Sequence, residues 1–442
     1  MRQAGGRVIR KLSNDTLVVF LSDSHIGGDA GRSIFESPDE LVRLFDDIDG
    51  HDGPVELVLA GDFFDLLRVA TVPEGSTRAA VTMARPEYAA LFARLRTFTA
   101  SPRRHVIYLP GNHDAEVWWN AAIHDGLVRD GLVHELALAY AATYEAEPAT
   151  IIYSEHGNEF DPPNRITDYN DRLDTPLGDH IVTDIIPRLP TGRAAAALQL
   201  DDIYRVYPLS ILPEWVAGRL FYALVTQAVR WLLVPIVVAY VAFETIAFLI
   251  GVGRKSINTL FIDVTYDVAL VLLAFSCFFL LARRMANRAL RTPSAHNEQG
   301  EAVDATVAKI RTMLEAGETP PLGRDVTGDI AVFVSGHTHA PSFTPFQRRG
   351  GRTGALVNSG CWLRQLQAVP TFFRLPTVFF SRFVLTHVRV YRASDGTRVE
   401  LWEQPRPAKQ EFRVAERLAV LGRVPREPAA DAPPRVLASA MV

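Results

Sequence analysis

Carboxylate, imidazole and amide side chains recur in short polar clusters along this chain, and each cluster follows an apolar run. The clusters are DSH at residues 23–25, GDFFD at 61–65, GNHD at 111–114, HG at 156–157 and GHTH at 336–339. Imidazole nitrogen combined with carboxylate and amide oxygen suits borderline divalent metals such as Mn, Fe or Zn. The candidate metal ligands are Asp23, His25, Asp62, Asn112, His156, His337 and His339.

The size of this ligand set indicates a pair of metal ions. A tetrahedral zinc site takes about four ligands, which leaves too many candidates for one ion. Two ions about 3.5–4 Å apart, sharing one carboxylate, would use them all. A water bound between two such ions loses a proton near neutral pH and can attack a phosphoryl group in line. We therefore expect hydrolysis of a phosphoester or pyrophosphate bond by a hydroxide that bridges two divalent metal ions.

The elements that must position these side chains alternate between strand and helix. Short apolar runs predict strands that end just before the clusters, at residues 16–21, 55–60, 105–109, 150–153 and 330–334. Helical spacing predicts helices from residue 38 to the stop at Gly50, over 85–100 and over 302–316. Sites in α/β sheets form at the carboxyl ends of strands. Gly61, Gly111 and Gly336 stand just before site residues, where a missing Cβ permits a close approach.

The five motifs, taken in order, resemble those of the calcineurin-like metallophosphoesterase family. The resemblance implies an α/β fold, a four-layer αββα sandwich with the dimetal site on its loop edge. It also implies that Asp23, His25 and His339 hold one metal and that Asn112, His156 and His337 hold the other. Asp62 would bridge the two ions. His113 would donate a proton to the leaving group or stabilise charge on the phosphate, oriented by Asp114.

The segment after His156 bears on the substrate. HGN followed by an acidic loop is loosely similar to the UDP-diacylglucosamine pyrophosphatase branch, although that branch commonly carries Arg where this chain has His113. Asn164 and Arg165 lie in this loop and are candidate substrate-binding residues; a polar loop without that role is the alternative.

A long apolar insertion separates the histidine motif from the last motif. Residues 231–250 and 260–282 are each long enough to span a bilayer core of about 30 Å, and a short connection predicts a helical hairpin. Arginines are concentrated on the two flanks, which predicts that both flanks are cytoplasmic. An even number of crossings is also required, because ligands on both sides must meet in one site. Buried core helices of a soluble domain are the alternative.

These observations predict the organisation of the whole chain. Residues 14–160 and 300–404 form a discontinuous catalytic domain, 161–299 the insertion, and 405–442 a flexible C-terminal tail rich in Pro, Ala and Arg. The protein is expected at the inner or plasma membrane with its catalytic domain in the cytoplasm.

The expected partners are the lipid bilayer and a phosphorylated substrate, with a lipid-linked phosphate as the first candidate. The net charge of -4 argues against nucleic acid as a partner. The alternatives are a tethered phosphodiesterase or protein phosphatase with a soluble substrate, and an inactive membrane scaffold.

Overall fold

Buried apolar runs form the central strands of two β-sheets. In the computed structural model, the described residues are 7–29, 33–185, 203, 206–207, 211–252, 256–289, 295–324, 326, 329–372 and 375–442. The strands β2 (Leu17–Leu21), β4 (Val55–Ala60) and β10 (Ile330–Ser335) are buried along their whole length. Strands covered on both faces are expected to be apolar, and these are apolar except for Glu56 in β4 and Ser335 at the end of β10.

The first sheet carries three of the five predicted clusters at the ends of its parallel strands β2, β4 and β6. Its order is β16 (Arg435–Met441), β15 (Gly396–Glu403), β14 (Val378–Ala393), β2, β4, β6 (Arg104–Leu109) and β7 (Glu135–Leu136), and β13 (Trp362–Val369) pairs with β14.

The second sheet carries the other two clusters, because β9 and β10 run parallel and side by side. Its order is β1 (Arg7–Leu12), β8 (Ala139–Tyr144), β9 (Glu147–Ser154), β10, β12 (Thr353–Asn358) and β11 (Ser342–Gln347). The short strands β3 (Ile26–Gly27) and β5 (Phe64–Asp65) form a separate pair beside the first sheet's loops.

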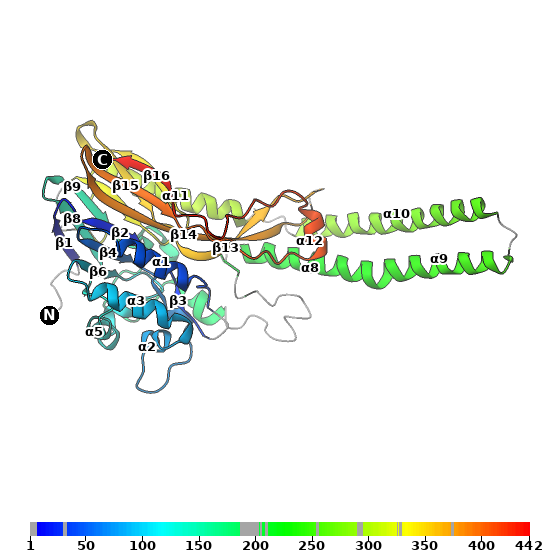
Figure 1. Cartoon of the computed structure of the whole chain (residues 1–442), viewed down its shortest axis with the longest axis horizontal. Coiled ribbons are helices and arrows are strands. Elements are labelled where there is room, and N and C mark those ends of the chain that lie inside the picture. Colours follow the sequence, from blue (N-terminus) through cyan, green and yellow to red (C-terminus); the bar gives the residue numbers. More distant parts are fainter. Residues whose placement is uncertain are drawn as a thin grey trace.

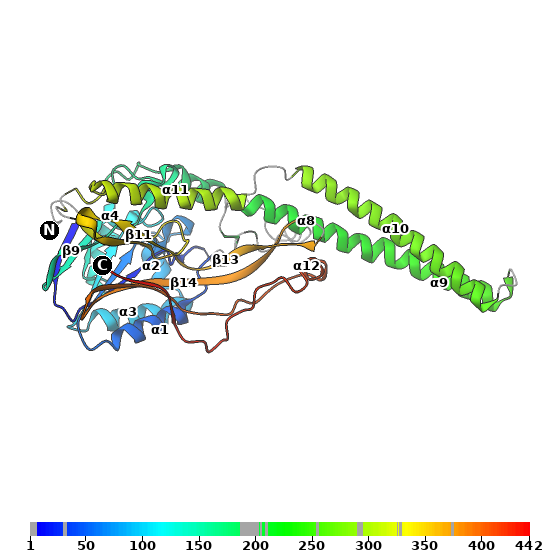
Figure 2. The same ribbon diagram turned by 90° about the horizontal axis from the view of Figure 1, so that it is seen from above.

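Three hydrophobic cores hold four layers together (Figures 1 and 2). Side chains such as Phe20 and Val332 fill the space between the two sheets. Leu44 and Phe92 join α1 (Pro38–Asp49) and α3 (Ala89–Thr99) to the outer face of the first sheet. Ile310 joins α11 (Ala295–Ala316) to the outer face of the second. The predicted four-layer αββα sandwich is therefore present.

Shorter helices fill the remaining connections in the described part of the chain. They are α2 (Arg78–Met83), α4 (Glu116–Trp119), α5 (Ala121–Arg129), α6 (Leu177–His180) with the following π-helical turn Ile181–Ile185, and α12 (Val414–Ala419).

The insertion forms a helical hairpin that projects from the sandwich (Figure 1). It consists of α8 (Leu212–Ala228), a π-helical turn (Val229–Leu233) and α9 (Val234–Leu249), followed by the returning helix α10 (Ile257–Ala289). Both helices are longer than the predicted spans. The first is longer because α8 packs on the β13–β14 hairpin through buried side chains such as Tyr222. The most apolar windows of both helices are not buried in the protein at all, unlike core helices of a soluble domain.

The prediction of a flexible tail at residues 405–442 is wrong, because the C-terminal segment is ordered against the sandwich. Strand β16 pairs antiparallel with β15, and Ala408, Ala419 and Val420 are buried. Helix α12 packs against α8 in the same cluster as Tyr222. The composition of this segment suggested disorder, but the edge of the first sheet supplies the backbone hydrogen-bond partners that order it. At the other end, β1 extends the sandwich to residues before the predicted start at residue 14.

Candidate metal centre

Five loops that leave the ends of parallel strands meet at one edge of the two sheets. The loop after β2 carries Asp23 and His25, and the loop after β4 carries Asp62. Asn112 follows β6, His156 follows β9, and His337 and His339 follow β10. The seven predicted ligands therefore lie together, although the hairpin separates the last two from the rest of the sequence.

The backbone at these loops is strained at most of the predicted ligands. Asp23, His25, Asp62, His337 and His339 are the non-glycine residues with positive φ in the described part of the chain. Such conformations cost roughly 1–3 kcal/mol each and persist where surrounding structure enforces them, typically at functional sites. The strain is concentrated on the candidate metal ligands.

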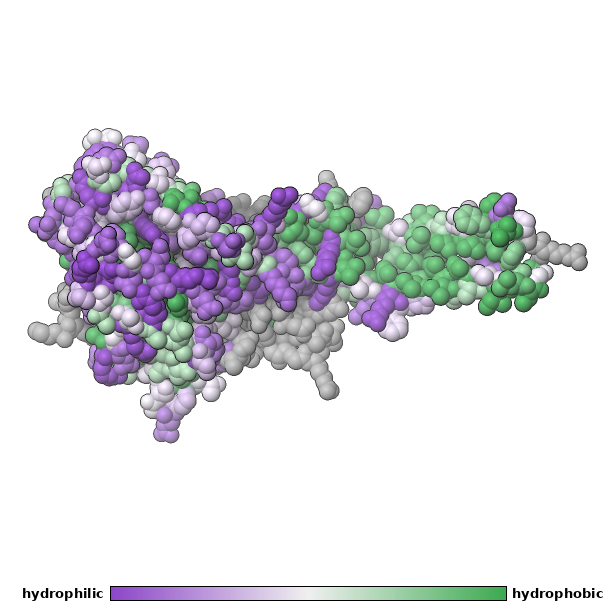
Figure 3. Space-filling view, viewed as in Figure 1, coloured by the Kyte–Doolittle hydropathy of each residue, from purple (hydrophilic) through white to green (hydrophobic). Residues whose placement is uncertain are grey.

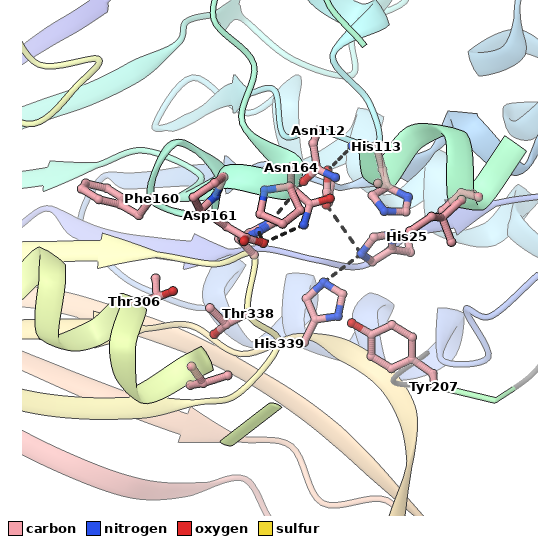
Figure 4. Close-up of a pocket in the computed structure, with 18 of the residues that line it drawn as sticks. His25, Asn112, His113, Phe160, Asp161, Asn164, Tyr207, Thr306, Thr338 and His339 are labelled. Carbon is pink, nitrogen blue, oxygen red and sulfur yellow. Dashed lines mark hydrogen bonds and ion pairs between the residues drawn. The ribbon is translucent and has the colours of Figure 1, made fainter. Parts of the chain in front are cut away.

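One group of ligands lies around Asp23. His339 Nε2 is 2.8 Å from Asp23 Oδ1. It is also 3.1 Å from His25 Nε2, a contact that Figure 4 shows. His25 Nε2 is in turn 3.7 Å from Asp62 Oδ2. All four side chains are buried, and one ligand atom from each falls within a single cluster that could hold a metal ion.

A second group lies on the other side of Asp62. His156 Nε2 is 3.2 Å from Asp62 Oδ2, and His337 Nδ1 is 3.1 Å from Asn112 Oδ1. The rings of His156 and His337 are 5.3 Å apart. Asp62 thus belongs to both groups, as a bridging carboxylate must.

The ligand atoms of these groups are arranged so that bound cations could contact them, and not all of them have hydrogen-bond partners in the protein. His156 Nδ1 donates to Ala60 O at 2.9 Å, and its Nε2 faces Asp62 Oδ2 at 3.2 Å without a hydrogen bond. A hydrogen bond from Nδ1 to a backbone carbonyl is the kind of contact that orients a metal-binding imidazole so that Nε2 can bind the ion. A buried ring nitrogen without a partner, such as His156 Nε2, is what a divalent metal ion would satisfy.

Burial and neighbouring charges shift the pKa values of these side chains in different directions. Although burial opposes it, Asp62 raises the pKa of His156 to about 10, so a metal ion would have to displace this proton. Burial lowers the pKa of His25 to about 3, which keeps this imidazole neutral. Burial opposes ionisation of Asp62, but the nearby His156 and His113 hold the pKa of its carboxyl well below the usual range. Neutral imidazole and ionised carboxylate are the ligand forms.

Glycine makes this packing possible at the three predicted positions, and at Gly111 a Cβ would overlap the carboxylate of Asp62. Gly61 has φ of 89°, and a Cβ there would overlap the ring of His156. A Cβ at Gly336 would overlap the carboxylate of Asp23. These observations confirm the expected close approach of backbone to site residues.

His113 lies beside the two groups, but its partner differs from the prediction. Its Nδ1 donates to Asp65 Oδ1 at 3.1 Å, and Asp65 Oδ2 lies 3.1 Å from Arg68 Nε. Although burial opposes it, the charges of Asp65 and Asp62 raise the pKa of His113 to about 9. Asp65 therefore orients the imidazole.

Asp114 has a different role from the predicted one of orienting His113. Its carboxylate accepts from Tyr108 Oη at 2.5 Å, Gly111 N at 2.6 Å and Phe64 N at 3.2 Å. These donors point its oxygens into the loop, so it holds the backbone that carries Asn112 and His113.

A cavity of about 740 Å³ opens above the two groups. His25, Asp62, Asn112, His113, His337 and His339 lie at its base. Of the predicted substrate-binding residues, Asn164 lines the cavity and donates to Asp161 Oδ2 at 2.6 Å. Arg165 is exposed and is not among the residues that line the cavity, and its role in substrate binding stays a prediction.

Several further residues of the site are not apparent from the motifs. Asp161 Oδ2 lies 2.9 Å from His337 Nε2 and so orients a candidate ligand. Tyr207, from the insertion, stacks on His339 with ring centres 4.9 Å apart, as Figure 4 shows. Arg68 and Lys309 place positive charge at the cavity wall. Asp65 is the last residue of the GDFFD motif, and this was the only indication in the sequence that it belongs to the site. Tyr207 and Lys309 lie outside every motif.

Comparison with known proteins agrees with this geometry. The family model of calcineurin-like phosphoesterases matches residues 16–197, which include the first four motifs. A comparison with curated proteins found no match. The matched residues form a calcineurin-like phosphoesterase domain, which indicates a hydrolase that acts on phosphoester bonds. His337 and His339 lie beyond the matched residues, and the structure brings them to the same site.

Proposed function

We propose that the protein is a membrane-anchored phosphoesterase that uses two divalent metal ions. Asp23, His25 and His339 would hold one ion, Asn112, His156 and His337 the other, and Asp62 both. When bound, the ions would supply activation of water and neutralisation of charge on the phosphoryl group. The observation that carries the proposal is the position of Asp62, which belongs to both clusters of ligand atoms.

The chain's own residues would complete the reaction. His113 Nδ1 is held by Asp65, which leaves Nε2 to donate a proton to the leaving oxygen. Arg68 lines the cavity and adds positive charge where phosphate oxygens would lie. Most of the ligands are buried, which limits water around them and so strengthens each electrostatic contact.

We also propose that α9 and α10 insert into the bilayer with the catalytic domain on the cytoplasmic side. Two helices are long and apolar enough to cross, and their outer surface is hydrophobic (Figure 3). The hairpin returns the chain to the sandwich, so the two halves of the site stay on one side. The arginines on the two flanks favour the cytoplasm for that side.

A substrate panel on the full chain, purified in detergent, tests the catalytic proposal. We expect Mn²⁺-loaded protein to hydrolyse bis-p-nitrophenyl phosphate or p-nitrophenyl phosphate and to contain close to two metal ions per chain. Metal content is measured on the same sample by elemental analysis. A sample that holds two ions and cleaves no phosphoester would instead support an inactive membrane scaffold. Preference for a phosphoprotein or a cyclic nucleotide would indicate a soluble substrate.

A further inference from the structure

The cavity above the metal groups has a polar base and a largely apolar wall. The wall includes Ile34, Phe160, Ile181, Val182, Tyr207 and Val303. Its volume lies within the range of roughly 300–1,000 Å³ that is typical of ligand pockets. A phosphate and metal ions need only the polar base, so the apolar wall requires a separate explanation.

The apolar wall is built largely by the segments that lead into and out of the hairpin. Ile181 and Val182 lie in the π-helical turn after α6, and Tyr207 lies shortly before α8. Val303 comes from α11, which follows α10 along the chain. The same insertion that forms the apolar hairpin thus also lines the cavity.

Some of this wall is left open to solvent. The side chain of Ile181 is 36% exposed although it lines the cavity. Apolar surface that stays exposed inside a pocket gains free energy when an apolar group covers it. The wall therefore favours a ligand that carries a hydrocarbon chain.

The aromatic residues of the wall are poorly placed to stack a nucleotide base. Tyr207 already stacks on His339 with an angle of 27° between the rings. Phe160 packs edge-on against Phe333 and lies 5.8 Å below the ammonium group of Lys309. These contacts occupy ring faces that a base would need.

We propose that the substrate is an amphipathic phosphoester, with its phosphate over the metal groups and its hydrocarbon chain against the wall. This inference rests on the proposed phosphoesterase function and names the substrate class for it. The basic side chains of Arg68 and Lys309 would contact the charged part of the molecule. The source of the chain is either a bilayer lipid or a free alkyl phosphate.

Binding of n-alkylphosphonates, which cannot be hydrolysed at the P–C bond, tests the proposal. The full chain in nanodiscs, loaded with Mn²⁺, is titrated by calorimetry with ethyl-, butyl-, hexyl- and octylphosphonate. We expect affinity to rise about fourfold per methylene, because each buried CH₂ contributes a similar increment. An affinity that is independent of chain length would overturn the proposal, as would tighter binding of a nucleoside monophosphate than of octylphosphonate.

A pair of variants locates the chain in the cavity. Ile181→Asn should reduce the ratio of octyl- to ethylphosphonate affinity at least fivefold. Val128→Asn is the matched control, because Val128 is 40% exposed on α5 and does not line the cavity. An unchanged ratio in Ile181→Asn would mean that the chain does not bind this wall and would contradict the proposal. Circular dichroism of both variants checks that they fold.

Two further measurements separate this inference from the proposed function and identify the source of the chain. Hydrolysis of bis-p-nitrophenyl phosphate without chain-length dependence of binding would leave the phosphoesterase function standing and reject the amphipathic substrate. Loss of both would reject both. Faster phosphate release from a long-chain phosphomonoester embedded in vesicles than from free octyl phosphate would identify a bilayer lipid, and the reverse would identify a soluble alkyl phosphate.

Discussion

Asp62 is the single side chain that joins the two groups of ligand atoms. One of its oxygens lies 3.2 Å from His156 Nε2 and 3.7 Å from His25 Nε2, and the other accepts from the backbone N of His113 at 2.8 Å. Its position follows from a left-handed conformation at the end of β4, with φ of 52°. Any change at this residue affects both groups at once.

Asp62→Ala should abolish phosphoester hydrolysis and reduce metal content, because under the proposed function this one carboxylate would hold both ions. Elemental analysis and the rate with bis-p-nitrophenyl phosphate measure the two effects. Asp125→Ala is the control, since Asp125 is an exposed residue of α5 away from the site. Full metal content and a normal rate in Asp62→Ala would contradict the bridging role.

His113→Ala should retain the metal ions and lower turnover by roughly 10²–10⁴-fold, the usual contribution of a proton donor. Its imidazole lies next to the groups without belonging to the two that share Asp62. Turnover and metal content are compared with those of His124→Ala, which removes a histidine that contacts Asp125 outside the site. An unchanged turnover would assign the proton transfer to another group.

At the scale of elements, β14 joins the core of the first sheet to the hairpin's base and carries a buried histidine. His387 is fully buried, and its Nε2 accepts from Arg389 Nε at 2.9 Å. Burial, with a smaller contribution from Arg389, holds the pKa of His387 well below its usual range. The folded protein therefore keeps this imidazole neutral under mildly acidic conditions.

His387 should make the folded state less stable as the pH falls below about 6.5, the ordinary pKa of histidine. The unfolded chain takes up a proton there and the folded chain does not, so acid favours unfolding. His387→Gln, whose amide oxygen can still accept from Arg389, should reduce the loss by up to about 1.4 kcal/mol per pH unit.

Unfolding by denaturant at pH 5 and pH 7 measures this dependence in the wild type and in His387→Gln. His124→Gln removes a partly exposed histidine and should keep the wild-type dependence. Equal pH dependence in wild type and His387→Gln would show that His387 takes up a proton in the folded state as readily as in the unfolded chain.

At the scale of the whole molecule, the protein is a four-layer sandwich with one apolar arm (Figures 1 and 3). Tyr240 on α9 donates to Asp267 on α10, so an acidic side chain of the arm has a partner on the other helix. Cys277 lies exposed on α10, while Cys361 is buried in the sandwich. This difference provides a chemical test of insertion.

In intact membranes, a polar maleimide should fail to label Cys277, because the proposed insertion would place α10 inside the bilayer. Ser256→Cys, at the start of α10, should be labelled from the side of the membrane opposite to the catalytic domain. Glu74→Cys is the control for the catalytic side, since Glu74 is exposed on a loop of the sandwich. Labelling of Ser256→Cys from the catalytic side alone would indicate a hairpin that enters the bilayer without crossing it.

The sequence by itself determined the chemistry of the site and the elements that carry it. The ligand residues stand next to apolar runs, and such runs encode strands locally, so positions such as Asp23 and His156 could be predicted as strand-end residues. The predicted strand at residues 55–60 coincides with β4. Every residue of this strand is buried, so apolar side chains are favoured along it and the run is visible in the sequence. The hairpin was apparent for the same reason, since its signal is a continuous apolar composition.

Only the tertiary structure decided which side chains meet across long sequence distances. Asp65 rather than Asp114 holds His113, since the donors of Tyr108 and Gly111 already occupy Asp114. The ordering of β16, the stacking of Tyr207 on His339 and the exposure of Arg165 likewise depend on how distant elements pack. Local sequence specifies strands and helices through short-range patterns of burial, but contacts between distant residues exist only after the sheets have assembled.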